Sequence, residues 1–204
     1  MRAGRSIDLE EAMKAADASV RAGADVAAGM FRGAIAREEK ADGTFVTEAD
    51  HAAERAILEI LADAIPDASV FAEESGKIER DPDLRWIVDP LDGTHRFARG
   101  GLFWGPLVVL EQHGEIVVGA MRLPMVDLTY VAARGLGSWR NGERMRVSDR
   151  RDWSGSNLSL GSTSRLLETP QREGVLRLIE SAEYTIAGGD LQGCAVVVSG
   201  FAEA

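Results

Sequence analysis

The chain has 204 residues, of which 45% are hydrophobic and 27% are charged, a balance typical of a globular protein rather than a disordered one. Its formal net charge is −10 and it holds no basic run, which argues against a nucleic acid or an anionic membrane surface as partner. No signal peptide is evident and no apolar run is long enough to span a bilayer, so the expected compartment is the cytoplasm.

Two helices are predicted in the first third of the chain. Asp8 can cap a helix that runs to about Phe31, because apolar residues recur there at the helical period. A second helix is expected from about residue 48 to residue 65, with Pro66 just after it. Between the two helices, Asp42-Gly43 is the turn signal within a short turn and strand at 40–46.

Residues 104–147 change to the pattern of strands. Strands are expected at 107–111, 116–122, 128–133, 138–140 and 144–147. Glycine-containing turns at His113-Gly114, 135–137 and Asn141-Gly142 separate them. This series predicts an antiparallel meander, and the helices that precede it predict an α+β fold with helices layered against an antiparallel sheet.

A polar stretch around residues 150–156 indicates a boundary between an α+β domain at 1–150 and the start of an α/β domain at 151–204. In the second part, a strand, a helix, a strand and a helix are expected at 158–160, 170–182, 184–186 and 191–201. Cys194 is the only cysteine, so no internal disulfide can form, and its apolar neighbours predict a buried thiol.

The segment at 86–94 is the most informative in the chain. Trp86-Ile87-Val88 is typical of a short buried strand that runs directly into Asp89. Pro90 has no N–H, so it is expected to end the sheet pairing there. Asp92 follows after a predicted turn, and both carboxylates can then point into one pocket. A turn alone would explain the Asp-Pro and Asp-Gly pairs, but not the apolar strand that leads into them.

Further acidic residues precede this segment. Glu73-Glu74 follows a short apolar run, and Asp50 lies in the first turn of the second predicted helix. Glu73 and the two aspartates would repel one another if brought together, so such a cluster holds either protons or a metal ion. Oxygen ligands without His or Cys favour magnesium or manganese over zinc. Gly93-Thr94 is typical of a helix start that can bind an anion, so together these residues predict a phosphate-handling site.

Structural alternatives exist for several of these residues. Thr47 and Asp50 fit the capping box of a helix start, and the glutamate pair alone would be a solvated loop. Asp190 is either the N-cap of the last predicted helix or a carboxylate that recognises a cationic substrate group, and the cap needs the fewer assumptions. Trp104 is either a core residue or the floor of a substrate pocket.

At the segments 47–50, 73–75 and 86–94, the chain resembles the inositol monophosphatase family of magnesium-dependent phosphatases. The resemblance extends from about Leu9 to the last residue, and it implies the layered αβαβα sandwich of that family. Within the family, the segments 100–105 and 188–190 are more similar to the histidinol-phosphate phosphatase branch than to the inositol branch.

This resemblance implies a site for two metals. Glu73, Asp89 and the backbone carbonyl of Leu91 would hold one Mg²⁺, with Mn²⁺ as the alternative ion, and Asp89 would bridge to a second metal that Asp92 also binds. The metals would lower the pKa of a water molecule and neutralise charge on the leaving oxygen. That water would attack phosphorus directly, without a covalent enzyme intermediate, and Glu73 is therefore counted among the catalytic residues.

The same resemblance implies roles for further residues. Thr94, paired with Asp50, would orient the attacking water, and the N–H groups of Gly93 and Thr94 would hold phosphate oxygens. The implied substrate is a small phosphorylated metabolite, with histidinol phosphate first and inositol or sugar phosphates next. Asp190 near the pocket would favour a substrate that carries an amine. Family members are commonly homodimers, so a homodimer is implied as well.

The sequence departs from the family pattern at two points. His95-Arg96 stands where the family has a small polar or lysine pair, and it adds bulk and charge beside the phosphate. The Trp-Asp motif that carries a further metal ligand does not occur, so the last strand and helix of the family fold are expected to be absent. The alternative function is therefore a catalytically weakened or inactive metal-binding homologue, or a fragment.

A phosphatase of the haloacid dehalogenase type is the other enzyme class that two neighbouring aspartates bring into question. In that class the first aspartate is a nucleophile that becomes phosphorylated, and one residue separates it from the second. Two residues separate Asp89 from Asp92, so the spacing disfavours this class.

Overall fold

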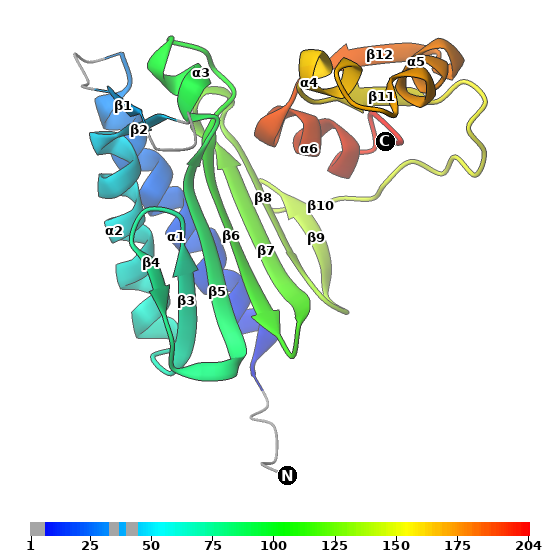
Figure 1. The fold of residues 1–204 in the computed structure, drawn as a ribbon. Helices are drawn as coiled ribbons and strands as arrows, with labels where there is room; N and C mark the ends of the chain where they lie inside the picture. Colours follow the sequence, from blue (N-terminus) through cyan, green and yellow to red (C-terminus); the bar gives the residue numbers. More distant parts are fainter. Residues whose placement is uncertain (1–6, 33–36, 40–44) are drawn as a thin grey trace. The chain divides into compact units, whose positions relative to one another are not determined.

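Two long helices cover one face of a large sheet in the first part of the chain (Figure 1). The structure, a computed structural model, describes residues 7–32, 37–39 and 45–204, and the chain forms two compact units, Met1–Arg144 and Met145–Ala204. In the first unit, α1 (Leu9–Met30) has Asp8 as its N-cap and α2 (Glu48–Ala64) has Thr47, so both predicted helices are confirmed. The predicted turn at 40–44 lies outside the described residues.

The sheet of the first unit has eight strands in the order β10-β9-β8-β7-β6-β5-β3-β4. In chain order the strands are β3 (Ala68–Ala72), β4 (Gly76–Ile78), β5 (Asp81–Asp92), β6 (Gly105–Gln112), β7 (Glu115–Leu123), β8 (Leu128–Ala133), β9 (Gly137–Arg140) and β10 (Glu143–Arg144). The meander from β6 to β10 is antiparallel, as predicted, but its last strand ends at Arg144 and does not extend over the predicted 144–147. However, β3 and β5 are parallel, so the sheet is mixed. The parallel pair arises because β4 lies on the outer side of β3 and β5 on its inner side.

Shorter elements are also described in the first unit. A two-stranded antiparallel ladder joins β1 (Arg37–Glu39) to β2 (Phe45–Thr47), and β2 leads directly into α2. The short helix α3 (Thr94–Ala98) follows the end of β5, and a 3₁₀ turn at Pro124–Val126 joins β7 to β8.

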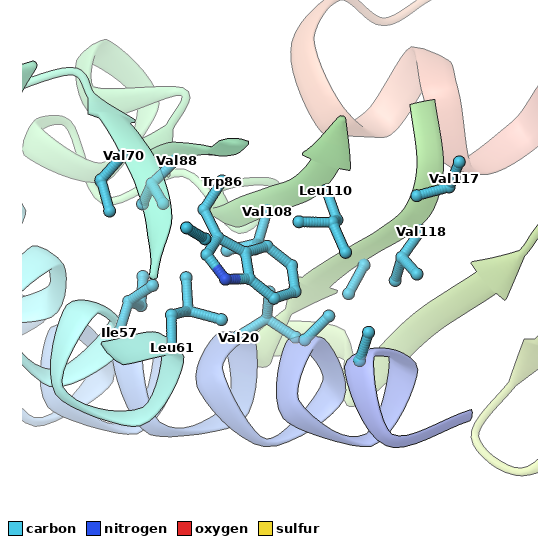
Figure 2. Close-up of a cluster of buried hydrophobic side chains, with 14 of the residues drawn as sticks. Val20, Ile57, Leu61, Val70, Trp86, Val88, Val108, Leu110, Val117 and Val118 are labelled. Carbon is cyan, nitrogen blue, oxygen red and sulfur yellow. The ribbon is translucent and has the colours of Figure 1, made fainter. Parts of the chain in front are cut away.

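The core of the first unit lies between the helices and the sheet (Figure 2). Trp86 on β5 is 1% exposed and is surrounded by apolar side chains from the helices and from the neighbouring strands. Alternate residues of β5 point to this side, since Leu84, Trp86 and Val88 are buried while the residues between them are partly exposed. The helices contribute Val20, Ile57 and Leu61 to the same cluster. This apolar layer fixes where β5 ends and therefore where its acidic residues lie.

The prediction that Pro90 ends the pairing of this strand is wrong. β5 continues through Pro90 to Asp92, with a register shift. Asp89 is paired with Leu107 and Asp92 with Gly105, so three steps along β5 oppose two steps along β6. One extra residue forms a bulge, and a bulge is where a strand tolerates a residue that has no N–H. The two aspartates are thus held by the sheet and not by a turn that follows it.

The second unit contains two parallel strands and three helices. They are β11 (Asn157–Leu160), α4 (Thr163–Leu167), α5 (Arg172–Ser181), β12 (Tyr184–Ala187) and α6 (Asp190–Val198). Asp190 is not the N-cap of α6, because Gly189 occupies that position in an extended conformation. The prediction that Cys194 is buried is also wrong, since α6 buries Leu191 and Ala195 and leaves Cys194 exposed.

None of the helices in the described parts of the chain is both long enough and apolar enough to cross a membrane.

Candidate active site

Parallel pairing of β3 and β5 brings two acidic segments together. Ala72 is paired with Val88 in this ladder, so the next residues along the two strands are Glu73 and Asp89. The N–H of Glu73 also donates to the carbonyl oxygen of Val88 at 3.1 Å. The acidic residues that the sequence singled out are therefore neighbours because of strand register.

The surroundings of Asp89 disfavour its negative charge. Burial raises the pKa of Asp89 from 3.8 to about 8, and the negative charges of Glu73 and Asp92 and a hydrogen bond with the Glu73 carboxyl raise it as well. The N–H of Leu91 donates to Asp89 Oδ1 at 3.0 Å and acts in the opposite direction on this pKa. Glu73 and Asp92 thus both lie within electrostatic reach of Asp89.

A hard cation fits this set of donors. Within residues 7–32, 37–39 and 45–204, no group of three or more His, Cys, Asp or Glu side chains is arranged, as it stands, to hold a metal ion. With a pKa of about 8, the Asp89 carboxyl instead keeps a proton at neutral pH. A divalent cation would replace that proton and relieve the repulsion, and magnesium prefers such oxygen donors. The roles of Glu73, Asp89, Leu91 and Asp92 as ligands remain predictions.

Asp50 connects the start of α2 to the end of β5. It is 1% exposed, and its Oδ2 accepts hydrogen bonds from the N–H of Thr47 at 2.8 Å and from Thr47 Oγ1 at 2.6 Å. The bond from the Thr47 N–H, together with the bond that Thr47 Oγ1 accepts from the N–H of Ala49 at 3.2 Å, forms the predicted capping box. Asp50 Oδ1 lies 3.0 Å from Thr94 Oγ1, 44 residues further along the chain. Burial raises the pKa of the Asp50 carboxyl, and the hydrogen bonds from Thr47 and Thr94 oppose that change.

The Asp50–Thr94 pair is the one that the resemblance implied. Thr94 Oγ1 also lies 2.9 Å from the carbonyl oxygen of Leu91. A hydroxyl has one hydrogen to donate, to either of these acceptors, and its remaining lone pairs can accept a hydrogen bond from water. The use of this pair to orient a nucleophilic water remains a prediction.

A tight turn at Gly93 links β5 to α3. Gly93 has φ 84° and ψ 30°, in the left-handed region, and a Cβ there would lie 3.1 Å from the carbonyl oxygen of Phe103. Its own carbonyl accepts from the N–H groups of Arg96 and Phe97, which starts the five-residue helix. The geometry of the turn thus requires glycine. The binding of phosphate by the N–H groups of Gly93 and Thr94 remains a prediction.

Trp104 is a core residue and not the floor of a pocket. It is fully buried, and its ring packs edge-on against Phe97 with 4.7 Å between centroids and tilted against Phe31 at 5.1 Å. Its Nε1 donates to the carbonyl oxygen of Gly101 at 3.0 Å. This aromatic cluster supports the segment that carries α3. Asp190 belongs to the second unit, and its proposed contact with substrate remains a prediction.

Glu54 is a residue that the sequence did not single out. It is 3% exposed on α2, and its carboxylate accepts hydrogen bonds from the N–H groups of Glu74 at 2.8 Å and Ser75 at 2.9 Å. A weak signal was present, because Glu54 lies four residues after Asp50 and so shares its helix face. Glutamate at such a spacing is ordinary on exposed helices, so the sequence alone did not separate it from a solvated residue.

Comparison with known proteins places the chain in a family. The model of the inositol monophosphatase family matches residues 8–203. The chain belongs to the inositol monophosphatase family. A histidinol-phosphatase of Chlorobaculum parvum is 35% identical over 164 residues, which is 80% of this chain and 63% of that protein. The Nus factor SuhB of Pasteurella multocida is 36% identical over 123 residues, which is 60% of this chain and 46% of that protein.

The fold agrees with this family. The structure of an inositol monophosphatase from Anabaena matches with a TM-score of 0.81 and 29% identity, over 96% of this chain and 74% of that one. The α+β sandwich with a large sheet is thereby confirmed. The chain spans 63% and 46% of the length of the two curated relatives. The family model matches through residue 203, and the expected loss of the last strand and helix stays a prediction.

Proposed function

We propose that this chain carries the metal-binding and water-orienting residues of a phosphatase that hydrolyses a small phosphate monoester. The observation that carries the proposal is the position of Glu73 and Asp92 near the buried Asp89, because burial and these two negative charges raise the pKa of Asp89 to about 8. Such a concentration of negative charge is unfavourable without a cation, so it points to Mg²⁺ or Mn²⁺. Family membership supports the same reaction class.

The residues of this chain have distinct parts in that reaction. Glu73, Asp89, Asp92 and the carbonyl of Leu91 would bind the metal, and bound metal would supply charge neutralisation at the phosphoryl group and activation of water. Thr94, held against buried Asp50 at 3.0 Å, offers its oxygen as acceptor to the attacking water. The N–H groups at Gly93 and Thr94 would orient phosphate oxygens.

Histidinol phosphate is the proposed first substrate. The relative from Chlorobaculum parvum is named a histidinol-phosphatase, and Asp190 offers a carboxylate for an amine. Phosphate release from histidinol phosphate, inositol 1-phosphate and fructose 1,6-bisphosphate at saturating Mg²⁺ tests the choice. We expect the highest kcat/KM with histidinol phosphate. No turnover above that of an Asp89→Asn control on any of the three would reject the proposed activity.

The alternative function is a metal-binding homologue without catalysis. Calorimetric titration with Mg²⁺, combined with the phosphate-release assay, distinguishes this homologue from the phosphatase. Tight Mg²⁺ binding without turnover would identify the non-catalytic homologue. An aspartyl-phosphate trapped at Asp89 would instead indicate the haloacid dehalogenase chemistry, which the family match disfavours. A homodimer is proposed from the family resemblance, and sedimentation equilibrium tests it.

A further inference from the structure

A buried carboxylate supports the loop that carries Glu73. Glu54 lies on α2 among buried neighbours, Ala53 and Ile57, and is itself 3% exposed. Each of its two oxygens accepts one backbone N–H, Oε2 from Glu74 at 2.8 Å and Oε1 from Ser75 at 2.9 Å. Hydrogen bonds to an ionised acceptor are stronger than neutral ones, and here they offset part of the cost of burying the charge.

The two N–H groups belong to the residues directly after Glu73. On its other side, the N–H of Glu73 donates to the carbonyl oxygen of Val88, the residue just before Asp89. The backbone of Glu73 is therefore fixed from β5 and from α2 at the same time. Loss of either attachment would let the carboxyl of Glu73 move relative to Asp89, although neither attachment touches these two side chains.

A purely structural need for Glu54 is small. Ser75 is exposed and Glu74 is partly exposed, so this turn lies at the surface, where water also competes for backbone N–H groups. Burying a carboxylate for that purpose alone would cost more than it returns. The same helix holds Thr94 through Asp50, one turn earlier, so α2 sets the position of both segments that approach the proposed metal site.

We propose that Glu54 is a positioning residue that holds Glu73 in place for binding Mg²⁺. This inference rests on the proposed function, because it takes Glu73 as a metal ligand. Glu54 does not contact the ion or the substrate. It acts by restricting the Glu73 backbone before the ion binds, so that less conformational entropy is lost on binding.

The test is calorimetric titration of Glu54→Gln with Mg²⁺. Glutamine has one acceptor oxygen, so one N–H of the turn loses its partner while side-chain size is kept. We expect the Kd for Mg²⁺ to rise about tenfold, in the range seen when outer partners of metal ligands are replaced. Amide hydrogen exchange of the metal-free protein should accelerate at Glu74 and Ser75. Glu59→Gln, the same change at an exposed position of α2, should alter neither quantity.

The outcomes separate this inference from the proposed function. Unchanged Mg²⁺ affinity in a folded Glu54→Gln protein, with only a lower Tm, would overturn the positioning role and leave the phosphatase proposal standing. Wild-type protein that binds no Mg²⁺ would instead overturn the proposed function. If Glu54→Gln does not fold, Glu54→Asp keeps the charge but withdraws it by about 1.5 Å, one bond length. Its Kd should then rise about threefold or more, and an unchanged Kd would reject the inference.

Discussion

The two halves of strand β5 obey opposite rules. Residues 84–88 place Leu84, Trp86 and Val88 in the apolar core, where burial is favourable by itself. Residues 89–92 place two carboxyls beside Glu73, where burial and like charge are both unfavourable. The first half stabilises the fold. The second half raises the free energy of the folded state, because it buries carboxyls next to each other, and a bound cation can remove this penalty. A single strand thus contributes both to the core and to the proposed active site. Substitutions in its two halves should therefore have different effects on stability and activity.

Trp86→Ala should have the largest effect on the scaffold. Removing this fully buried ring leaves a large cavity, and the free energy of unfolding should fall by about 3–5 kcal/mol. Urea titration measures the loss. Phe71→Ala is the matched control, because Phe71 is 42% exposed on the neighbouring strand, and it should cost much less. A similar loss for both variants would contradict the core described here.

Asp89→Asn should reduce activity and leave the stability of the fold intact. Phosphate release should fall by at least about a hundredfold, because a central charge for the cation is lost. The metal-free protein should be as stable as the wild type or more stable at neutral pH, because folding no longer requires a buried acid to take up a proton above its ordinary pKa. Thermal unfolding and an initial-rate assay measure both quantities. A strong loss of stability would show that the carboxylate supports the fold.

The stability of the metal-free protein should depend on pH through the carboxyl of Asp89. The pKa of Asp89 is about 8 in the folded chain and 3.8 for an ordinary aspartate, so the folded state holds the proton more tightly. The resulting contribution to stability is complete below about pH 4 and is lost as pH rises to about 8, with a slope of at most about 1.4 kcal/mol per pH unit for one proton. Denaturant titrations between pH 5 and pH 9, on wild type and Asp89→Asn, measure it. Saturating Mg²⁺ should remove the fall in unfolding free energy with pH in the wild type. Equal slopes for the two metal-free proteins would show that Asp89 is not the cause of this fall.

Thr47→Ala should give the smallest effect. It removes the hydroxyl that donates to Asp50 and accepts the N–H of Ala49, but it keeps the bond from the Thr47 N–H to Asp50. The loss of helix capping should cost about 1 kcal/mol. The carboxyl of Asp50 is then held by fewer donors, and kcat should fall by a few fold with little change in the Kd for Mg²⁺. Thr47→Ser, which keeps the hydroxyl, should stay close to wild type in stability and kcat. Steady-state kinetics at saturating Mg²⁺ compares them.

Local signals were enough to predict most of the first unit. The caps at Asp8 and Thr47 and the turn glycines of the meander depend on a few adjacent residues, and these features are confirmed. The parallel pairing of β3 with β5 was not predicted, because it depends on which side of β3 the chain returns to. Pro90 was misjudged for a related reason, since a bulge is defined by the partner strand.

The candidate site shows the same division. Glu73, Asp89 and Asp92 could be found because carboxylates that directly follow apolar strands are unusual. Glu54 could not, because its importance comes from two N–H groups 20 and 21 residues away. Cys194 and Asp190 were misplaced because both predictions assumed where α6 begins and which side it buries. Contacts between residues that are distant in the sequence are thus the features that composition and hydrophobic periodicity could not predict.

The parallel β3–β5 ladder also has a consequence for how the protein is made. The side chains proposed to bind the ion lie between Glu73 and Asp92, so they leave the ribosome before β6 does. Once α2 and the two strands have docked, these donors repel one another unless an ion or a proton joins them. Cellular magnesium would therefore act as a folding ligand, and its supply during synthesis would influence the yield of native chain.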